Sequence, residues 1–266
     1  MRTLVPFTLN FNGNCARFPF IFEESPVACA PSCLISARTA GDMVFSFPEQ
    51  NKNRDHFFRS RGIPPEKVYS LVQVHSRDVF TVDELEPAAE PREGDGMISF
   101  SPDVFCAVTV ADCLPVFLLD TEKGFFAVLH SGWKGTGITA KALEIMQRAG
   151  TRPEAVAAVL GPCIQSCCYR VDEERAKQFE EEFGSSFPFI QDNTGYPLGK
   201  VIRQDSAGWY IALQAANARI LAAAGVRNIT YCTDCTFTDT RFGSFRREGA
   251  LSFTKMITLA GPNINE

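Results

Sequence analysis

The sequence predicts an α+β fold in one domain, with mixed, largely antiparallel β-sheets and helices on the outside. The first observation is a series of short β-branched and apolar runs, separated by glycine and proline, in the first half of the chain. The second is a long apolar run, 104–120, that a tight turn connects to another strand. The third is the alternation of helical and strand patterns after residue 138. No repeat, low-complexity tract or linker divides residues 1–266, which favours a single domain.

The first third of the chain predicts short strands and one helix. Residues 1–40 are punctuated by prolines and predict two or three strands that end at Arg38. A helix is predicted over 49–62, where a Gly-Ile-Pro-Pro segment ends it. Residues 68–82 are rich in β-branched side chains and predict a strand that is interrupted after Val74. The acidic segment that follows predicts a loop, and a short strand is expected at residues 97–100.

The rest of the chain predicts a hairpin and then alternating elements. The apolar run 104–120 and the segment 125–130 form the two arms of the hairpin, both largely buried. The elements predicted after it are a helix at 139–149, a strand at 155–160, an acidic helix at 172–183, an alanine-rich helix at 206–224 and strands at 226–231 and 250–258.

Composition excludes several classes of function. The formal net charge is −5, and no run of lysine or arginine forms a basic stripe, so nucleic acid is not an expected partner. No segment has the length of a membrane span, and the N-terminus lacks the apolar core of a signal peptide. We therefore expect a cytoplasmic protein whose ten cysteines stay reduced.

The hairpin brings two metal-ligating side chains together. If Asp120 pairs with Phe125, then Pro115 lies opposite His130, and Cys113 becomes a diagonal neighbour of that histidine on the same face. Their Cβ atoms are then about 7 Å apart, which allows both side chains to bind one ion.

A third ligand completes the candidate site. His75 also lies where a strand breaks, and the chain has only three histidines. One thiolate and two imidazoles with an open fourth position are typical of catalytic zinc. His75, Cys113 and His130 are therefore the candidate zinc ligands and catalytic residues. Asp112 joins the catalytic candidates as an acid beside the thiol, although a regular strand places it on the opposite face.

Lys134, Arg246 and Arg247 follow turns or glycine-rich sequence, where anions bind. The candidate phosphate-binding residues are Arg38, Lys134 and Arg246. The cysteines at 163, 167, 168, 232 and 235 have the spacing of metal loops, but one site would have to be built from both segments, and free thiols are the favoured interpretation.

Six motifs together resemble the laccase-domain family, variously called polyphenol oxidase, purine nucleoside phosphorylase and peptidoglycan editing factor. The resemblance spans roughly residues 34–258, and the third and fourth of these motifs are highly specific as a pair. In order, the motifs are Gln73-Val74-His75, Gly94-Asp95-Gly96, Ala111-Asp112-Cys113-Leu114-Pro115-Val116, His130-Ser131-Gly132-Trp133-Lys134-Gly135, Gly161-Pro162-Cys163-Ile164 with Cys167-Cys168-Tyr169, and Ser244-Phe245-Arg246-Arg247.

The resemblance implies a single domain of mixed sheets flanked by helices, with one zinc on His75, Cys113 and His130. It also implies metal-dependent phosphorolysis of adenosine, inosine and methylthioadenosine, and deamination of adenosine. The partners implied are thus a purine nucleoside and phosphate, whereas the oligomeric state is left open. Two departures concern the substrate: Arg170 replaces the usual acid after the tyrosine, and Phe242-Gly243 keeps one aromatic ring fewer than the family's usual FFSYRR segment.

Two other functions use the same residues. A cysteine hydrolase acting on peptidoglycan precursors would employ Cys113 as nucleophile and His130 or His75 as base. A copper-dependent polyphenol oxidase is a minor alternative, since one Cys/His/His site can bind copper. Multicopper chemistry needs many more imidazoles than the three in this chain.

Overall fold

A computed structural model describes residues 3–45, 51–85, 92–184 and 199–264. Its largest sheet has seven strands, four of which are connected by antiparallel pairing. From one edge to the other they are β1 (Thr3–Phe7), β17 (Asn228–Cys232), β13 (Val156–Leu160), β11 (Leu114–Asp120), β12 (Phe126–Ser131), β9 (Gly96–Ser99) and β8 (Val79–Thr81).

A second sheet of six strands lies against the first. Its strands in order are β2 (Phe11–Asn12), β3 (Cys15–Arg17), β6 (Ser32–Ser36), β18 (Met256–Gly261), β10 (Phe105–Val110) and β7 (Val68–Tyr69). Two small sheets complete the set: β14 (Arg170–Val171), β16 (Gly208–Ile211) and β15 (Ile202–Asp205) form one, and β4 (Ile21–Phe22) and β5 (Ser25–Pro26) form the other.

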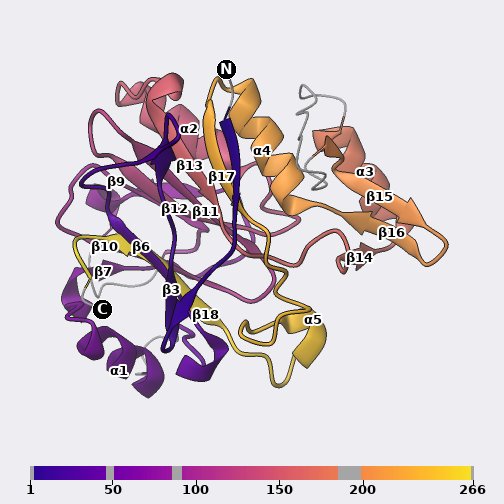
Figure 1. The fold of residues 1–266 in the computed structure, drawn as a ribbon, viewed down its shortest axis with the longest axis horizontal. Coiled ribbons are helices and arrows are strands. Elements are labelled where there is room, and N and C mark those ends of the chain that lie inside the picture. Colours follow the sequence, from indigo (N-terminus) through magenta and orange to yellow (C-terminus); the bar gives the residue numbers. More distant parts are fainter. Residues whose placement is uncertain (1–2, 46–50, 86–91, 185–198, 265–266) are drawn as a thin grey trace.

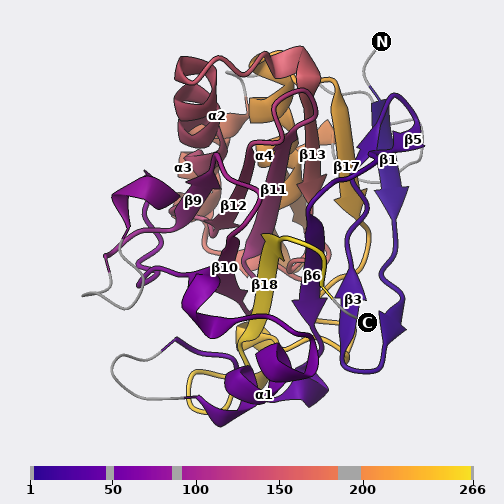
Figure 2. The same ribbon diagram turned by 90° about the vertical axis from the view of Figure 1, so that its left-hand side faces the viewer.

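The helices lie outside the two large sheets (Figures 1 and 2). They are α1 (Lys52–Ser60), α2 (Ile138–Arg148), α3 (Glu173–Phe183), α4 (Leu213–Ala223) and α5 (Phe245–Glu248), with short 3-10 turns at Arg38–Ala40, Pro65–Lys67, Val82–Glu84 and Pro153–Ala155. Figures 1 and 2 show α1 at one end of the molecule and α2 and α4 at the other. The predicted α+β class, with largely antiparallel sheets and external helices, is confirmed.

Three apolar layers hold this stack together. The first lies between the seven-stranded sheet and its helices, where Leu118 on β11 packs with Leu143 on α2 and Leu221 on α4. The second lies between the two large sheets, because the alternate residues of the same strands, such as Phe117, point the other way. The third lies between the six-stranded sheet and α1, whose Phe57 is fully buried. The central strands β11, β12 and β13 are therefore buried on both faces, which explains their continuous apolar sequences.

Most predicted elements are present, and three regions are divided differently. The apolar run 104–120 is not one hairpin arm: β10 and β11 belong to different sheets, and the chain turns between them at Asp112, whose φ is +84°. The predicted helix at 206–224 begins only at Leu213, because its first residues form β16. Residues 1–40 contain six short strands instead of two or three.

The predicted bounds of the last strand also differ from the observed ones. The closing strand runs over Met256–Gly261 and not over 250–258. Parts of the predicted helix at 49–62 and of the loop at 83–93 lie outside the described residues. Within the described ranges, no helix combines the length and the apolar character that a bilayer crossing requires.

Candidate metal centre

The candidate site lies where the β11–β12 hairpin opens at the end away from its turn. The predicted register is confirmed: Leu119 pairs with Phe126 and Pro115 with His130. Beyond Leu114 the strand ends, and Cys113 and Gly132 lie side by side, since a Cβ on Gly132 would stand 3.0 Å from the Cys113 sulfur.

The structure brings the three predicted ligands together. One ligand atom from each of His75, Cys113 and His130 lies within 4.8 Å of the other two. The two imidazole rings meet edge to face, with centroids 4.9 Å apart. His130 is buried, Cys113 is partly buried and His75 is exposed, so the cluster is open to solvent on the side of His75. A thiolate and two imidazoles are ligand types that zinc and copper prefer, and their spacing here suits either ion.

Asp95 orients the cluster, and it is fully buried. One oxygen of its carboxylate lies 2.7 Å from Nδ1 of His130, which leaves Nε2 for a metal. The same carboxylate accepts hydrogen bonds from the backbone N–H groups of His75 and Ser76, at 3.1 and 2.6 Å. Asp95 therefore holds both histidines. This role of Asp95 was not predicted from the sequence, although an acid between two glycines before a buried strand was a usable signal.

The His75 loop is held in a conformation that few side chains adopt. His75 has a φ of +61°, in the left-handed region, and tertiary contacts must maintain it. Besides Asp95, these contacts include Gln73, which donates to the backbone oxygen of Thr109 and accepts from its N–H. Gln73 thus anchors the loop to β10, and the first motif of the sequence has a structural reason.

Gly132 provides the space in which the ligands meet. A Cβ at this position would stand 2.9 Å from Cδ2 of His75 and 3.0 Å from the sulfur of Cys113, closer than real contacts allow. The next glycine in the turn, Gly135, has the same role toward the loop backbone, because its Cβ would stand 2.8 Å from the oxygen of Ser76. Glycine at both positions lets the turn after β12 approach the His75 loop.

Mutual electrostatics change the proton affinities of the cluster. Burial alone would raise the pKa of the Cys113 thiol, but the charges and hydrogen bonds of His130 and His75 outweigh it and lower the pKa to about 6. Burial would lower the pKa of His130, but the Cys113 thiolate and Asp95 raise it. Both shifts favour the ionised forms of the pair, and the thiolate is the form that binds metals.

Asp112 does not point into the cluster. Its carboxylate accepts hydrogen bonds from the hydroxyls of Thr236 and Ser244, at 2.6 and 3.0 Å, and from the backbone N–H of Arg246, at 2.7 Å. These contacts come from segments more than a hundred residues away in sequence, so the sequence offered no signal for them. Asp112 therefore fixes the chain turn that presents Cys113, and it anchors the start of α5.

The three predicted cations have different surroundings. Arg38 forms an ion pair with Glu248 at 3.1 Å, close to α5. The side chain of Arg246 donates to the backbone oxygen of Arg170 at 2.8 Å and lies over the ring of Tyr169. Lys134 is exposed in the turn after β12. Arg246 thus lies on α5 and Arg38 beside it, whereas Lys134 lies on the turn that carries Gly132.

The chain is similar in sequence to several known enzymes. The chain is 30% identical to a purine nucleoside phosphorylase of Corynebacterium glutamicum over 79% of its own length and 81% of that protein. It is 31% identical to a purine nucleoside phosphorylase of Deinococcus radiodurans, over 74% and 71% of the two chains. It is 33% identical to the adenosine deaminase RL5 of an unknown prokaryotic organism, over 66% and 68%.

Solved structures show the same fold. YlmD from Geobacillus stearothermophilus superposes with a TM-score of 0.80 over 97% of this chain and 99% of that one, at 23% identity. YfiH from Bacillus licheniformis gives a TM-score of 0.73 over 88% and 93%, at 22% identity. A family model described as multi-copper polyphenol oxidoreductase laccase matches residues 48–261, a range that contains all three ligands. The chain belongs to this laccase-domain family.

Proposed function

We propose that this protein is a metal-dependent purine nucleoside phosphorylase that converts adenosine, inosine or methylthioadenosine and phosphate into the free base and a sugar 1-phosphate. The observation that carries the proposal is the cluster of His75, Cys113 and His130, with its open side and its buried Asp95. The relatives named purine nucleoside phosphorylase and adenosine deaminase support the same substrate class, and deamination of adenosine is a second expected activity.

His75, Cys113 and His130 would hold the ion, which we propose to be zinc, with copper as the alternative. When bound, a zinc ion supplies Lewis-acid stabilisation of negative charge and can lower the pKa of a bound water. Asp95 accepts a hydrogen bond from Nδ1–H of His130 and so keeps the other ring nitrogen directed at the cluster. Gly132 keeps the approach to the ligands free of side chain.

The chain's cations would bind the second substrate. In phosphorolysis a phosphate oxygen forms a bond to C1′ of the sugar while the bond from C1′ to the purine nitrogen breaks. The purine leaves with the electron pair and takes up a proton. We assign phosphate binding to Arg38, Lys134 and Arg246, since cationic donors stabilise the phosphate charge and position the attacking oxygen. Asp112 positions Arg246 through its backbone N–H.

A nucleoside panel assayed with and without phosphate tests the proposal. Chromatography should detect free base and ribose 1-phosphate only when phosphate is present. Base formed at the same rate without phosphate would mean hydrolysis, and inosine formed from adenosine would mean deamination. Absence of turnover of every purine nucleoside by the zinc- and copper-loaded protein would overturn the proposal.

The histidines supply matched variants. His75→Ala and His130→Ala should abolish phosphorolysis and reduce bound metal, because each removes a ligand. His56 is the third histidine of the chain and lies exposed on α1, so His56→Ala should retain the activity of the wild type. Wild-type rates in either ligand variant would contradict the assignment.

One observation favours a second candidate, a cysteine hydrolase acting on peptidoglycan precursors. The Cys113 thiol has a pKa of about 6, and His130 stands between it and Asp95, as in a nucleophile–base–acid triad. Metal analysis distinguishes the two functions. Stoichiometric zinc that is lost in Cys113→Ala, with no covalent adduct on the thiol during turnover, favours the phosphorylase, whereas an acyl adduct on Cys113 of metal-free enzyme favours the hydrolase.

A further inference from the structure

Two loops that carry cysteines meet at one edge of the seven-stranded sheet. β13 and β17 are parallel neighbours, so their carboxyl ends lie at the same edge. The loop after β13 carries Cys167 and Cys168, and the loop after β17 carries Cys235. The backbones of Cys163 and Cys235 form an isolated parallel β-bridge between the loops, and both thiols are free. The N–H of Thr236 donates to the backbone oxygen of Cys163 at 3.1 Å.

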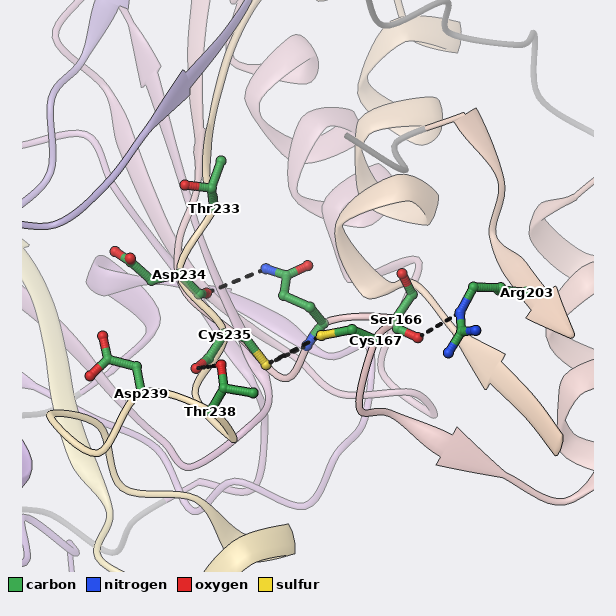
Figure 3. A pocket seen from close by; sticks show the side chains of 9 residues that line it. Ser166, Cys167, Arg203, Thr233, Asp234, Cys235, Thr238 and Asp239 are labelled. Carbon is green, nitrogen blue, oxygen red and sulfur yellow. Dashed lines mark hydrogen bonds between the residues drawn. The ribbon is translucent and has the colours of Figure 1, made fainter. Parts of the chain in front are cut away.

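This contact between the loops brings the sulfur atoms of Cys167, Cys168 and Cys235 together. The sulfur of Cys167 lies 3.3 Å from that of Cys168 and 3.9 Å from that of Cys235, and all three lie within 4.8 Å of one another. Figure 3 shows the side chains of Cys167 and Cys235 directed at each other from the two loops. The backbone N–H of Gln165 also points at the Cys235 sulfur, at 3.4 Å. Backbone N–H groups directed at sulfur stabilise thiolates in metal sites.

The cluster is accessible to an ion. Cys167 is exposed and Cys168 is partly buried, whereas Cys235 is buried and is 7% exposed. A cavity of about 600 Å³ adjoins the sulfurs and is lined by Cys167 and Cys235 together with Arg203, Asp234 and Asp239 (Figure 3). The cavity gives an ion and a fourth, water ligand a path to the thiols.

We propose that Cys167, Cys168 and Cys235 form a second metal site, separate from the His75 cluster, for a thiophilic d10 cation, Zn²⁺ or Cu⁺. Sulfur ligands at about 2.3 Å from a metal are about 3.8–4.0 Å from one another in tetrahedral or trigonal geometry. The 3.9 Å separation already fits this value, and the 3.3 Å separation needs to open by only about half an ångström. Three thiolate ligands favour soft cations.

An ion at this site would connect two loops that also hold the turn at Asp112. The N–H of Ile164 donates to the backbone oxygen of Asp112 at 2.9 Å, and the hydroxyl of Thr236 donates to its carboxylate. Because Asp112 precedes Cys113, the second ion would stabilise the segment that presents a ligand of the first. The proposed role of the second ion is therefore structural, and it does not depend on the reaction at the first site.

Metal titration of the full chain tests the proposal. The reduced protein is stripped with a chelator under anaerobic conditions, loaded with Zn²⁺ or, separately, with buffered Cu⁺, desalted and submitted to elemental analysis. We expect about two ions per chain with at least one of the metals, one for each cluster. Loading should also protect the cluster thiols from a thiol reagent and raise the thermal midpoint of unfolding.

The variants assign the second ion. Cys167→Ser and Cys168→Ser lie at accessible positions and should each lose one ion while keeping the other, with circular dichroism like that of the wild type. Cys29→Ser, in an exposed cysteine outside the cluster, should keep both. Uptake of only one ion with either metal, in a protein whose Cys113→Ala variant takes up none, would overturn the proposal. So would unchanged stoichiometry in both cluster variants, or a Cys167–Cys235 disulfide that persists in the reduced protein.

Discussion

At the scale of single residues, Asp95 connects the two histidine ligands. Its carboxylate contacts the ring of His130 and the backbone of the loop that carries His75. Asp95→Asn keeps the shape but removes the charge and replaces one acceptor with a donor. We expect metal affinity to fall by about 10- to 100-fold, the usual cost of losing such a partner. Competition with a chromogenic chelator measures the change.

Asp78 provides the control for this substitution. It is exposed and lies on the same loop, so Asp78→Asn changes the net charge by the same amount next to the site. We expect it to bind metal as the wild type does. Equal losses of affinity in the two variants would mean that general electrostatics, and not the contact with His130, explain the effect.

Gly132 acts through the space that it leaves. Its backbone is not in the left-handed region, so alanine is compatible with its conformation, but the added Cβ would collide with His75 and Cys113. Gly132→Ala should therefore lower metal affinity by about tenfold or more and leave stability nearly unchanged. Gly124→Ala should show the reverse, since it has open space but a φ of +73°, and it should lose about 1 kcal/mol of stability with unchanged metal affinity. Chelator competition and urea unfolding of both variants measure the two effects.

At the scale of elements, the hairpin was predictable and the turn before it was not. A tight turn at residues 121–124 fixes the pairing of β11 with β12, so the approach of Cys113 to His130 follows from local sequence alone. The change of sheet at Asp112 depends on donors from Thr236 and Ser244, which are distant in sequence. Apolar content cannot distinguish one long strand from two buried ones, and for this reason the run 104–120 was interpreted as continuous.

This turn makes a prediction about Asp112. Asp112→Ala would leave two buried hydroxyls and the Arg246 N–H without their acceptor, and we expect the free energy of unfolding to fall by about 2–4 kcal/mol in urea titrations. Asp103→Ala, in an exposed acid, should change it by less than about 0.5 kcal/mol. If Asp112→Ala is as stable as the wild type but inactive, the carboxylate acts on substrate and not on the turn.

At the scale of the whole molecule, the site depends on the stacking of two sheets that the sequence did not show. The seven-stranded sheet carries His130 at the end of β12, and the six-stranded sheet holds the His75 loop through the contact of Gln73 with β10. The sequence supplies the strands and the ligand types, but the order of strands follows from packing between segments far apart in the chain. The single domain stays a prediction.

Glu248, the last residue of α5, connects this helix with the N-terminal part of the chain, and its side chain is only 8% exposed. It forms ion pairs with Arg38 and Arg247, at 3.1 and 2.8 Å, and accepts from the N–H of Thr254 at 2.9 Å. Burial would raise the pKa of this carboxyl, but the donors from Thr254, Arg247, Ser244 and Arg38 outweigh it and lower the pKa. Because the folded pKa is below the unfolded value of about 4.3, the stabilisation is present above that pH and is lost as the pH falls through the folded pKa.

Glu248→Gln should therefore lower the free energy of unfolding by about 2 kcal/mol at pH 7, where the wild-type carboxylate is charged and fully paired. The difference between wild type and variant should stay constant down to about pH 5 and shrink below about pH 4, as the wild-type group takes up its proton. Glu181→Gln, in an exposed residue of α3, is the control and should follow the wild type at every pH. Urea unfolding across this pH range gives the comparison, and a loss of stability in Glu248→Gln that persists unchanged at low pH would assign the effect to packing instead of charge.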